Sequence, residues 1–282
     1  MRPFEYERPK ALAEALSVLT KHGSTARVMA GGTDVMIRLR MGHMRPGVLL
    51  DIKDVRELSD RIVETGGVLR FGARVTMTEI AEDDRVRRHF GALAEAALVV
   101  GSVQIRNRAT LAGNACNASP AGDTPPALLV YGATLNLVSA GGRRSVPITE
   151  FFTGPGKTVK TPEELVESID VPLPTARVGA AFGRITRRYG VDLATINLAC
   201  RVDASGETRF AYGAVGPRPF LVVDTSGILA DPNAAADAKS TVLRELIGHA
   251  SPITDVRGGR SYRLGMLDVM SRRTLATALE RL

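Results

Sequence analysis

The sequence predicts an α+β protein with two domains. Segments with helical periodicity alternate with short apolar runs over the first 174 residues, and paired glycines interrupt two hairpin patterns. Four prolines lie between Gly154 and Pro174, where the composition changes. With 282 residues, 44% of them hydrophobic, the chain is long enough for two cores. We expect one domain over residues 1–174 and a smaller α+β domain over residues 175–282.

The first half of the chain predicts helices and strands in alternation. Leu12, Ala15, Leu16 and Leu19 share one face of a helix over residues 9–23, with Gly23 at its end. The elements that follow are a strand over 26–30, a helix over 34–41, a strand over 47–53, a hairpin over 62–76 and a buried helix over 86–101. We place a subdomain boundary at about residue 55, between subdomains 1–55 and 56–174.

Residues 101–123 lack clear periodicity and are rich in Gly, Asn, Ser and Ala, which predicts a long functional loop. A helix over 124–133, a hairpin over 134–148 and a strand over 167–172 complete the first domain. Beyond Pro174 the pattern predicts three strands between 177 and 216, followed by helices that include 243–250 and 262–282.

Charge and cysteine content exclude several classes of protein. The net charge of +7 comes from 37 Lys and Arg against 30 Asp and Glu, but the basic residues are scattered and do not alternate with aromatic ones, so we do not expect nucleic-acid binding. Cys116 and Cys200 are too few and too far apart to hold an iron–sulfur cluster or another metal. No apolar run of membrane-spanning length and no secretory signal is found, and we expect a soluble cytoplasmic protein.

The segment RVMAGGTD joins an apolar strand to a helix through Gly31 and Gly32. Paired glycines let consecutive backbone N–H groups point into one concavity, which suits a diphosphate. Thr33 could cap the following helix or bind an anion through its hydroxyl. A simple tight turn is an equally good interpretation of the glycines alone. Neither the three-glycine dinucleotide fingerprint nor the P-loop pattern is present.

A second loop, TLAGN, has the same character. Thr110 and Asn114 flank Ala112 and Gly113, and Asp123 follows thirteen residues after Thr110. Two such loops could hold one diphosphate from opposite sides.

The pair AGGTD and TLAGN, in this order, with QIRN before the second and SPAGD after it, resembles the FAD-binding medium subunits of molybdenum hydroxylases. This family includes carbon monoxide, xanthine and nicotinate dehydrogenases. The resemblance covers essentially the whole chain, including ESIDVP and RRYGVDLA. It implies an FAD-binding domain of the vanillyl-alcohol-oxidase and p-cresol-methylhydroxylase type, made of two subdomains and followed by a smaller α+β domain.

The resemblance also implies the residues that hold non-covalent FAD. Asp123 would bond the ribityl or flavin region, Val166 would lie near the adenine, and Arg184 would occupy a position that is commonly lysine. The two diphosphate loops would comprise Val28, Met29, Ala30, Gly31, Gly32, Thr33, Asp34, Val35, Thr110, Ala112, Gly113 and Asn114.

Three positions depart from the family pattern. Ala112 stands where many relatives have glycine, so we expect a negative φ there. Arg184 keeps the positive charge but replaces a compact ammonium with a planar fork, which leaves its contact with FAD open. Arg27 also stands where lysine is frequent.

The remaining candidates are better explained by structure than by chemistry. The four histidines, at 22, 43, 89 and 249, have no metal-ligand spacing and lie outside both glycine loops, so covalent flavin is not expected. Cys116 is better explained as a small apolar residue than as a redox modulator. Arg187, Arg188 and Asp192 could touch a flavin or a partner, or form a solvated ion-pair cluster.

The resemblance implies an electron-transfer subunit with no catalytic residue and no metal of its own. A molybdopterin-binding large subunit and a small subunit with [2Fe–2S] clusters would supply electrons, and NAD⁺ or a quinone would accept them. Two alternatives stay open: a self-sufficient flavin oxidase with its own substrate, and a flavin-free scaffold protein.

Overall fold

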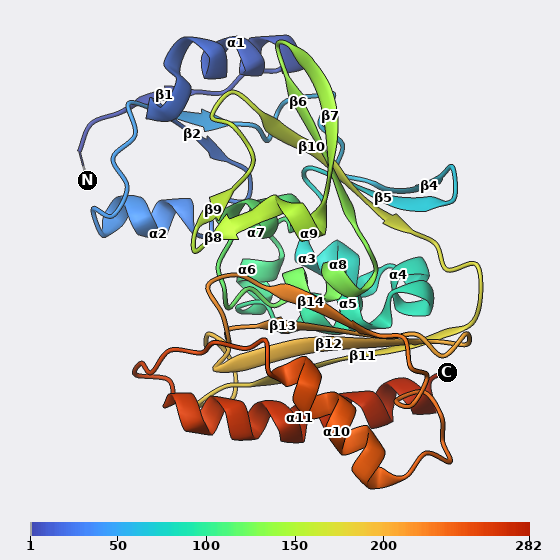
Figure 1. Ribbon diagram of the computed structural model, residues 1–282. Coiled ribbons are helices and arrows are strands. Elements are labelled where there is room, and N and C mark those ends of the chain that lie inside the picture. Colours follow the sequence, from blue (N-terminus) through green and yellow to red (C-terminus); the bar gives the residue numbers. More distant parts are fainter. Residues whose placement is uncertain (1) are drawn as a thin grey trace.

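Three larger sheets and one two-stranded sheet are found in the computed structural model, which describes residues 2–282 (Figure 1). The α+β class is confirmed, because parallel and antiparallel sheets occur together with covering helices. The expected elements are mostly present, and the differences lie in short helices and edge strands.

The first sheet is small and parallel, with the order β1-β3-β2. Its strands are β1 (Glu5–Glu7), β2 (Ala26–Met29) and β3 (Val48–Asp51). Helix α1 (Leu12–His22) packs on it through the four predicted residues, all buried, and is followed by the 3-10 turn η1 (Gly23–Thr25). Helix α2 (Val35–Arg40) follows β2. Strand β1 was not predicted because its three residues are exposed and carry no apolar pattern.

The second sheet is antiparallel, with the order β4-β5-β10-β6-β7. Both predicted hairpins are confirmed, and Gly66 and Gly67 adopt φ values of 55° and 78° at the first turn. The strands are β4 (Ile62–Thr65), β5 (Val68–Gly72), β6 (Thr134–Ser139), β7 (Gly142–Pro147) and β10 (Leu165–Pro172).

Short helices fill the space between the second and third sheets. They are α3 (Met77–Glu82), α4 (Asp84–His89), α5 (Gly91–Leu98), α6 (Val103–Arg106), α7 (Leu111–Asn117), α8 (Thr124–Val130) and α9 (Ile148–Phe151), followed by the strand pair β8 (Phe152–Gly154) and β9 (Lys157–Thr158).

Two expectations about these helices were wrong. The single helix over 86–101 is two helices, because the buried Phe90 leaves helical geometry at φ −135° and ψ 47°. The long loop over 101–123 contains α6 and α7, which are too short to give a periodic pattern.

The third sheet is an antiparallel meander of four strands, not the three expected. It consists of β11 (Val178–Ile185), β12 (Ile196–Asp203), β13 (Thr208–Gly213) and β14 (Phe220–Asp224). The edge strand β14 was missed because it follows a proline-containing turn and is only half-buried. Helices α10 (Ala236–Ile247) and α11 (Arg260–Glu280) cover one face, and α5 and α8 contact the other (Figure 1).

The third sheet is joined to the rest of the chain by a shared core and by ion pairs. One apolar cluster includes Ala199 and Ala211 of the sheet together with residues of α5 and α8. Glu95 accepts a hydrogen bond from the Phe182 amide at 2.9 Å and pairs with Arg281 at 2.6 Å. The sheet therefore packs directly on the helical layer.

Candidate functional site

The first glycine loop lies between β2 and α2. Gly32 has a φ of 78°, in the region that favours glycine. The amide N–H groups of Gly31, Gly32, Thr33 and Asp34 donate to no acceptor within residues 2–282. The loop thus presents four consecutive backbone donors, as a nest for an anion requires.

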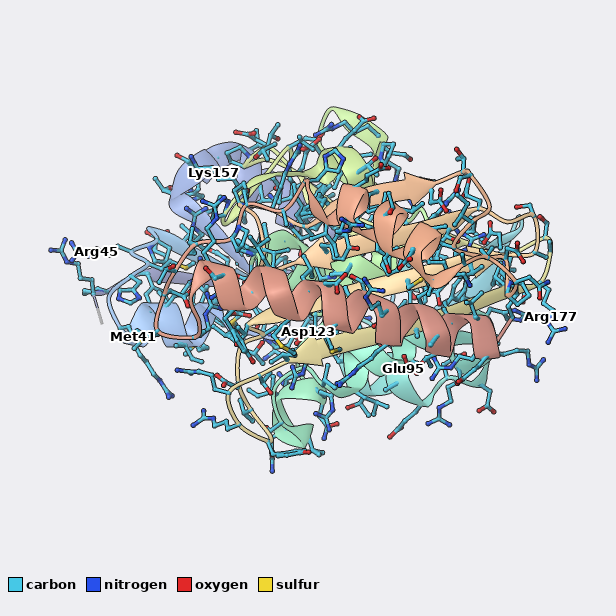
Figure 2. All side chains as sticks on the ribbon, turned by 60° about the horizontal axis from the view of Figure 1, so that its bottom comes forward. Met41, Arg45, Glu95, Asp123, Lys157 and Arg177 are labelled. Atoms are coloured by element: carbon cyan, nitrogen blue, oxygen red, sulfur yellow. The ribbon has the colours of Figure 1, made fainter. Side chains whose placement is uncertain are left out.

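Of the two roles suggested for Thr33, capping of α2 is not observed, and anion binding stays a prediction. The N-cap residue is Asp34, and its side chain makes no capping hydrogen bond. The segment is also open on its outer side, because Ile37 and Met41 are 54% and 65% exposed. Figure 2 shows Met41 and Arg45 extending outward at one end of the molecule, opposite Arg177.

The second glycine loop forms the start of α7. Thr110 is the N-cap residue, and its hydroxyl accepts a hydrogen bond from the Gly113 amide at 3.0 Å. Ala112 has no positive φ, as expected, and its amide and that of Thr110 have no acceptor within residues 2–282. The Asn114 side chain accepts a hydrogen bond from the Thr124 hydroxyl at 2.7 Å, which joins the loop to α8.

The two loops are in direct backbone contact. A methyl group on Gly31 would lie 1.8 Å from the carbonyl oxygen of Arg108 and 3.1 Å from the Cα of Ala109. Glycine is therefore required at position 31 by the close approach of the segment that leads into Thr110. The simple-turn interpretation of this glycine does not account for that contact. The unbonded amides of both loops consequently lie on adjoining segments, an arrangement that fits one diphosphate.

The apolar residues of the predicted site point into the cores. Met29 and Val35 belong to the cluster around α2, and Val28 packs on the cluster beneath α1. Val166 is 5% exposed, lies in the main core, and precedes a bulge in β10, a strand that contacts α7. The side chains of these residues therefore contribute to packing, fully for Met29 and Val166 and partly for Val28 and Val35.

Asp123 and Arg184 form a buried ion pair between the helical layer and the third sheet. An Arg184 guanidinium N–H donates to Asp123 Oδ2 at 3.0 Å, and the two side chains are 15% and 10% exposed. Burial raises the pKa of Asp123 to about 6, although Asn197 and Arg184 both act to lower it.

Asn197 is the residue of this cluster that sequence reasoning missed. It is fully buried in β12 and donates from Nδ2 to Asp123 Oδ1 and to the Gly122 carbonyl, both at 3.0 Å. An amide side chain within the apolar run ATINLAC is the signal that could have identified it.

Other candidates lie apart from the glycine loops. Arg187 pairs with Asp192 at 3.0 Å on an exposed loop, which fits the ion-pair interpretation. Cys116 packs against the main core, and burial raises the pKa of its thiol. Within residues 2–282 no group of three or more His, Cys, Asp or Glu side chains could hold a metal ion. No helix of this part of the chain is long and apolar enough to cross a membrane.

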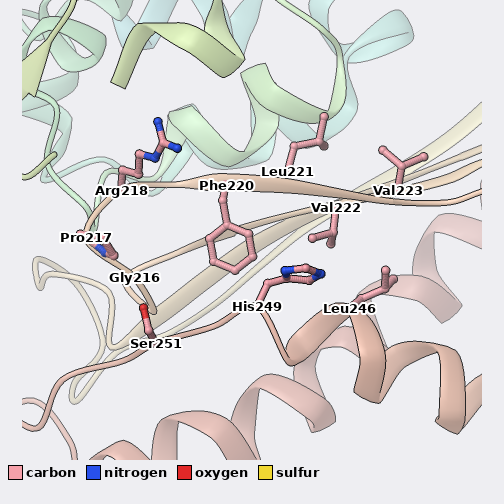
Figure 3. Close-up of a pocket in the computed structure, with 10 residues that line it drawn as sticks. All are labelled: Gly216, Pro217, Arg218, Phe220, Leu221, Val222, Val223, Leu246, His249 and Ser251. Carbon is pink, nitrogen blue, oxygen red and sulfur yellow. The ribbon is translucent and has the colours of Figure 1, made fainter. Parts of the chain in front are cut away.

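A pocket of about 510 Å³ lies at the β14 edge of the third sheet (Figure 3). His249, one of its lining residues, lies near Leu246 and Val222, between the end of α10 and the strand. None of the lining residues belongs to either glycine loop or to the Asp123 cluster.

Comparisons with known families identify the two halves of the chain. The family described as the FAD binding domain in molybdopterin dehydrogenase matches residues 2–174, and the CO dehydrogenase flavoprotein C-terminal domain matches residues 180–278. Fold and site thus define a flavoprotein subunit of a multi-subunit oxidoreductase.

Curated relatives and solved structures agree with this class. The chain is 31% identical to the xanthine dehydrogenase FAD-binding subunit of Escherichia coli O157:H7, over 97% of this chain and 95% of the relative. It is 30% identical to the carbon monoxide dehydrogenase medium chain of Hydrogenophaga pseudoflava, over 99% and 98%. Reconstituted CO dehydrogenase from Oligotropha carboxidovorans superimposes with a TM-score of 0.92 at 29% identity, covering 100% of this chain and 99% of that one. The chain belongs to the family of FAD-binding subunits of molybdopterin dehydrogenases.

Proposed function

We propose that this chain binds FAD non-covalently and passes electrons through it as one subunit of a heteromeric molybdenum hydroxylase. The observation that carries the proposal is the backbone contact between Gly31 and Arg108, which joins two loops with unbonded amides. When bound, FAD supplies a centre that accepts electrons singly and releases a pair as hydride.

The residues present fit such a cofactor. We assign the diphosphate to the backbone of residues 28–35 and to the loop 110–114, where N–H groups would offset its charge. Asp123 and Arg184 are assigned to the flavin end, and Val166 to the adenine end. The ion pair between Asp123 and Arg184 supports the first assignment because it leaves further guanidinium donors free for a ligand.

We also propose the assembly in which the chain works. A molybdopterin-binding large subunit and a [2Fe–2S] small subunit would deliver electrons, and NAD⁺ or a quinone would remove them. Relatives named as medium chains of carbon monoxide dehydrogenase support a subunit role. The cytoplasmic location stays a prediction.

We assign the first domain to the vanillyl-alcohol-oxidase and p-cresol-methylhydroxylase type, with subdomains 1–55 and 56–174. The division is supported by the sheets, because the strands of the parallel sheet lie within residues 5–51 and those of the antiparallel sheet within 62–172. The C-terminal domain would comprise residues 175–282.

Purification of the chain tests the proposal. The protein should be yellow, should release FAD into solution on denaturation, and should not turn over small substrates alone. Co-expression with the proposed large and small subunits should give a complex that turns over substrate. Whether NAD⁺ or a quinone analogue reoxidises the reduced flavin then identifies the acceptor. A folded chain that binds no FAD would overturn the proposal, and substrate turnover by the isolated chain would favour the self-sufficient oxidase.

A further inference from the structure

A row of three residues crosses the third sheet beneath Asp123. Arg184 on β11 is the register partner of Asn197 on β12, which in turn is the register partner of Gly213 on β13. Asp123, from the helical layer, bonds to the first two of them at 3.0 Å. The middle strand therefore holds a buried amide directly beside the ion pair.

The Asn197 amide has one acceptable orientation. Its Nδ2 donates to two acceptors, the Gly122 carbonyl and Asp123 Oδ1. Its Oδ1 has no partner within the described residues and lies over Gly213, where a Cβ would be only 2.1 Å away. If the amide were reversed, Oδ1 would point at two hydrogen-bond acceptors, which is unfavourable. The amide nitrogen therefore stays directed at residues 122–123, although this leaves the buried Oδ1 without a hydrogen bond.

Most N–H donors of the Arg184 guanidinium have no acceptor within residues 2–282. A guanidinium carries five N–H donors, and Arg184 makes a single hydrogen bond within residues 2–282, although its side chain is only 15% exposed. Buried donors normally find partners. The remaining donors fit a ligand at the flavin end of the site.

We propose that Asn197 is a positioning residue for the flavin: its amide holds the Asp123 carboxylate ionised and oriented, and Asp123 in turn fixes the Arg184 guanidinium toward the cofactor. This inference rests on the proposed function. Among the elements of residues 2–282 that pack around Asp123, Arg184 of β11 supplies the charged side chain. The neighbours from α8 and β12, Thr124 and Asn197, carry no charge.

The pH dependence of bound FAD tests this role. In the full-length chain loaded with FAD, the visible spectrum should change as Asp123 titrates. Asn197→Ala removes a donor that favours the carboxylate, so the midpoint of this change should move to higher pH by about one unit, a tenfold change in proton affinity. Asn136→Ala is the matched control, since the Asn136 amide donates to Ser168 at 3.0 Å in the second sheet. Its midpoint should equal that of the wild type.

A background without the carboxylate separates positioning from general damage. In Asp123→Asn the pH transition should disappear, and adding Asn197→Ala should then leave the spectrum unchanged with pH. An unchanged midpoint in Asn197→Ala, or the same transition in the Asp123→Asn background, would overturn the inference. If Asn197→Ala does not fold, Gly213→Ala displaces the same amide and should give the same upward shift, and an unchanged midpoint in that variant overturns the inference as well. Failure of the wild-type chain to bind FAD would instead remove the proposed function itself.

Discussion

Replacing Gly31 with alanine should separate the two glycine loops. The added methyl group would lie 1.8 Å from the carbonyl oxygen of Arg108 and 2.6 Å from its carbonyl carbon. Because Cβ contacts under 3.0 Å are essentially never found, the loops must move apart by at least 1.2 Å. A rigid backbone on both sides leaves no flexible side chain to absorb this shift.

The effect on FAD binding follows from hydrogen-bond geometry. A displacement of this size takes an amide-to-phosphate bond of about 2.9 Å beyond hydrogen-bonding range. A bond to a charged group contributes about 1.5–3 kcal/mol, so losing one should weaken FAD binding by about 10- to 100-fold. The overpacking itself should lower the free energy of unfolding by about 1–3 kcal/mol.

Titration of the apoprotein with FAD, followed by quenching of flavin fluorescence, measures the affinity, and thermal unfolding measures the stability. Gly265→Ala is the control, because Gly265 is exposed in α11 and has no atom within 4 Å of the added Cβ. That variant should bind FAD normally and gain up to about 1 kcal/mol of stability. A Gly31→Ala protein with wild-type affinity and wild-type Tm would refute the reasoning.

Substitutions at Gly32, Arg263 and Asp123 each have a measurable outcome. Gly32→Val places a β-branched residue at a φ of 78°, so the purified variant should have lost its flavin absorbance, and full absorbance would contradict this. Arg263 is 1% exposed and donates to the Thr195 and Ala214 carbonyls at 2.8 Å, so Arg263→Met should lower the free energy of unfolding by about 3–5 kcal/mol, whereas Met at the exposed Arg273 should change it little. The pKa of Asp123 rises from 3.8 to about 6 on folding, so the folded chain binds the extra proton and this stabilisation is lost as pH rises through 6. Relative to Asp123→Asn, the free energy of unfolding of the wild type should fall by about 2 kcal/mol between pH 4 and 7 in denaturant titrations, and a constant difference would contradict the assignment.

Much of the fold could be predicted because its signals are local. The buried face of α1 and the glycine hairpins depend on residues within one element or one turn. Strand β1 and strand β14 could not be predicted, because each is a strand only through pairing with a neighbour. The break at Phe90 has the same origin, since burial of its ring decides the backbone there.

The candidate site could be predicted only as separate loops. The glycines of both loops are visible in the sequence, but the contact of Gly31 with Arg108 joins residues 77 positions apart. Asn197 and its bonds to the 122–123 segment depend in the same way on the packing of the third sheet against α8. Recognition of the family supplied Asp123 and Arg184, whereas their pairing is a result of the structure.

The Asp123 cluster also sets an order of events during biosynthesis. Asp123 leaves the ribosome 61 residues ahead of Arg184 and 74 ahead of Asn197. At a synthesis rate of about 5–20 residues per second, Arg184 is synthesised roughly 3–12 s after Asp123. During that interval the carboxylate lacks both its counter-charge and its amide donor, so a flavin nucleotide captured early would be held by the glycine loops alone. If the proposed site holds FAD, tight retention of the cofactor would begin only once the third sheet has docked, and flavin content would then report completed folding.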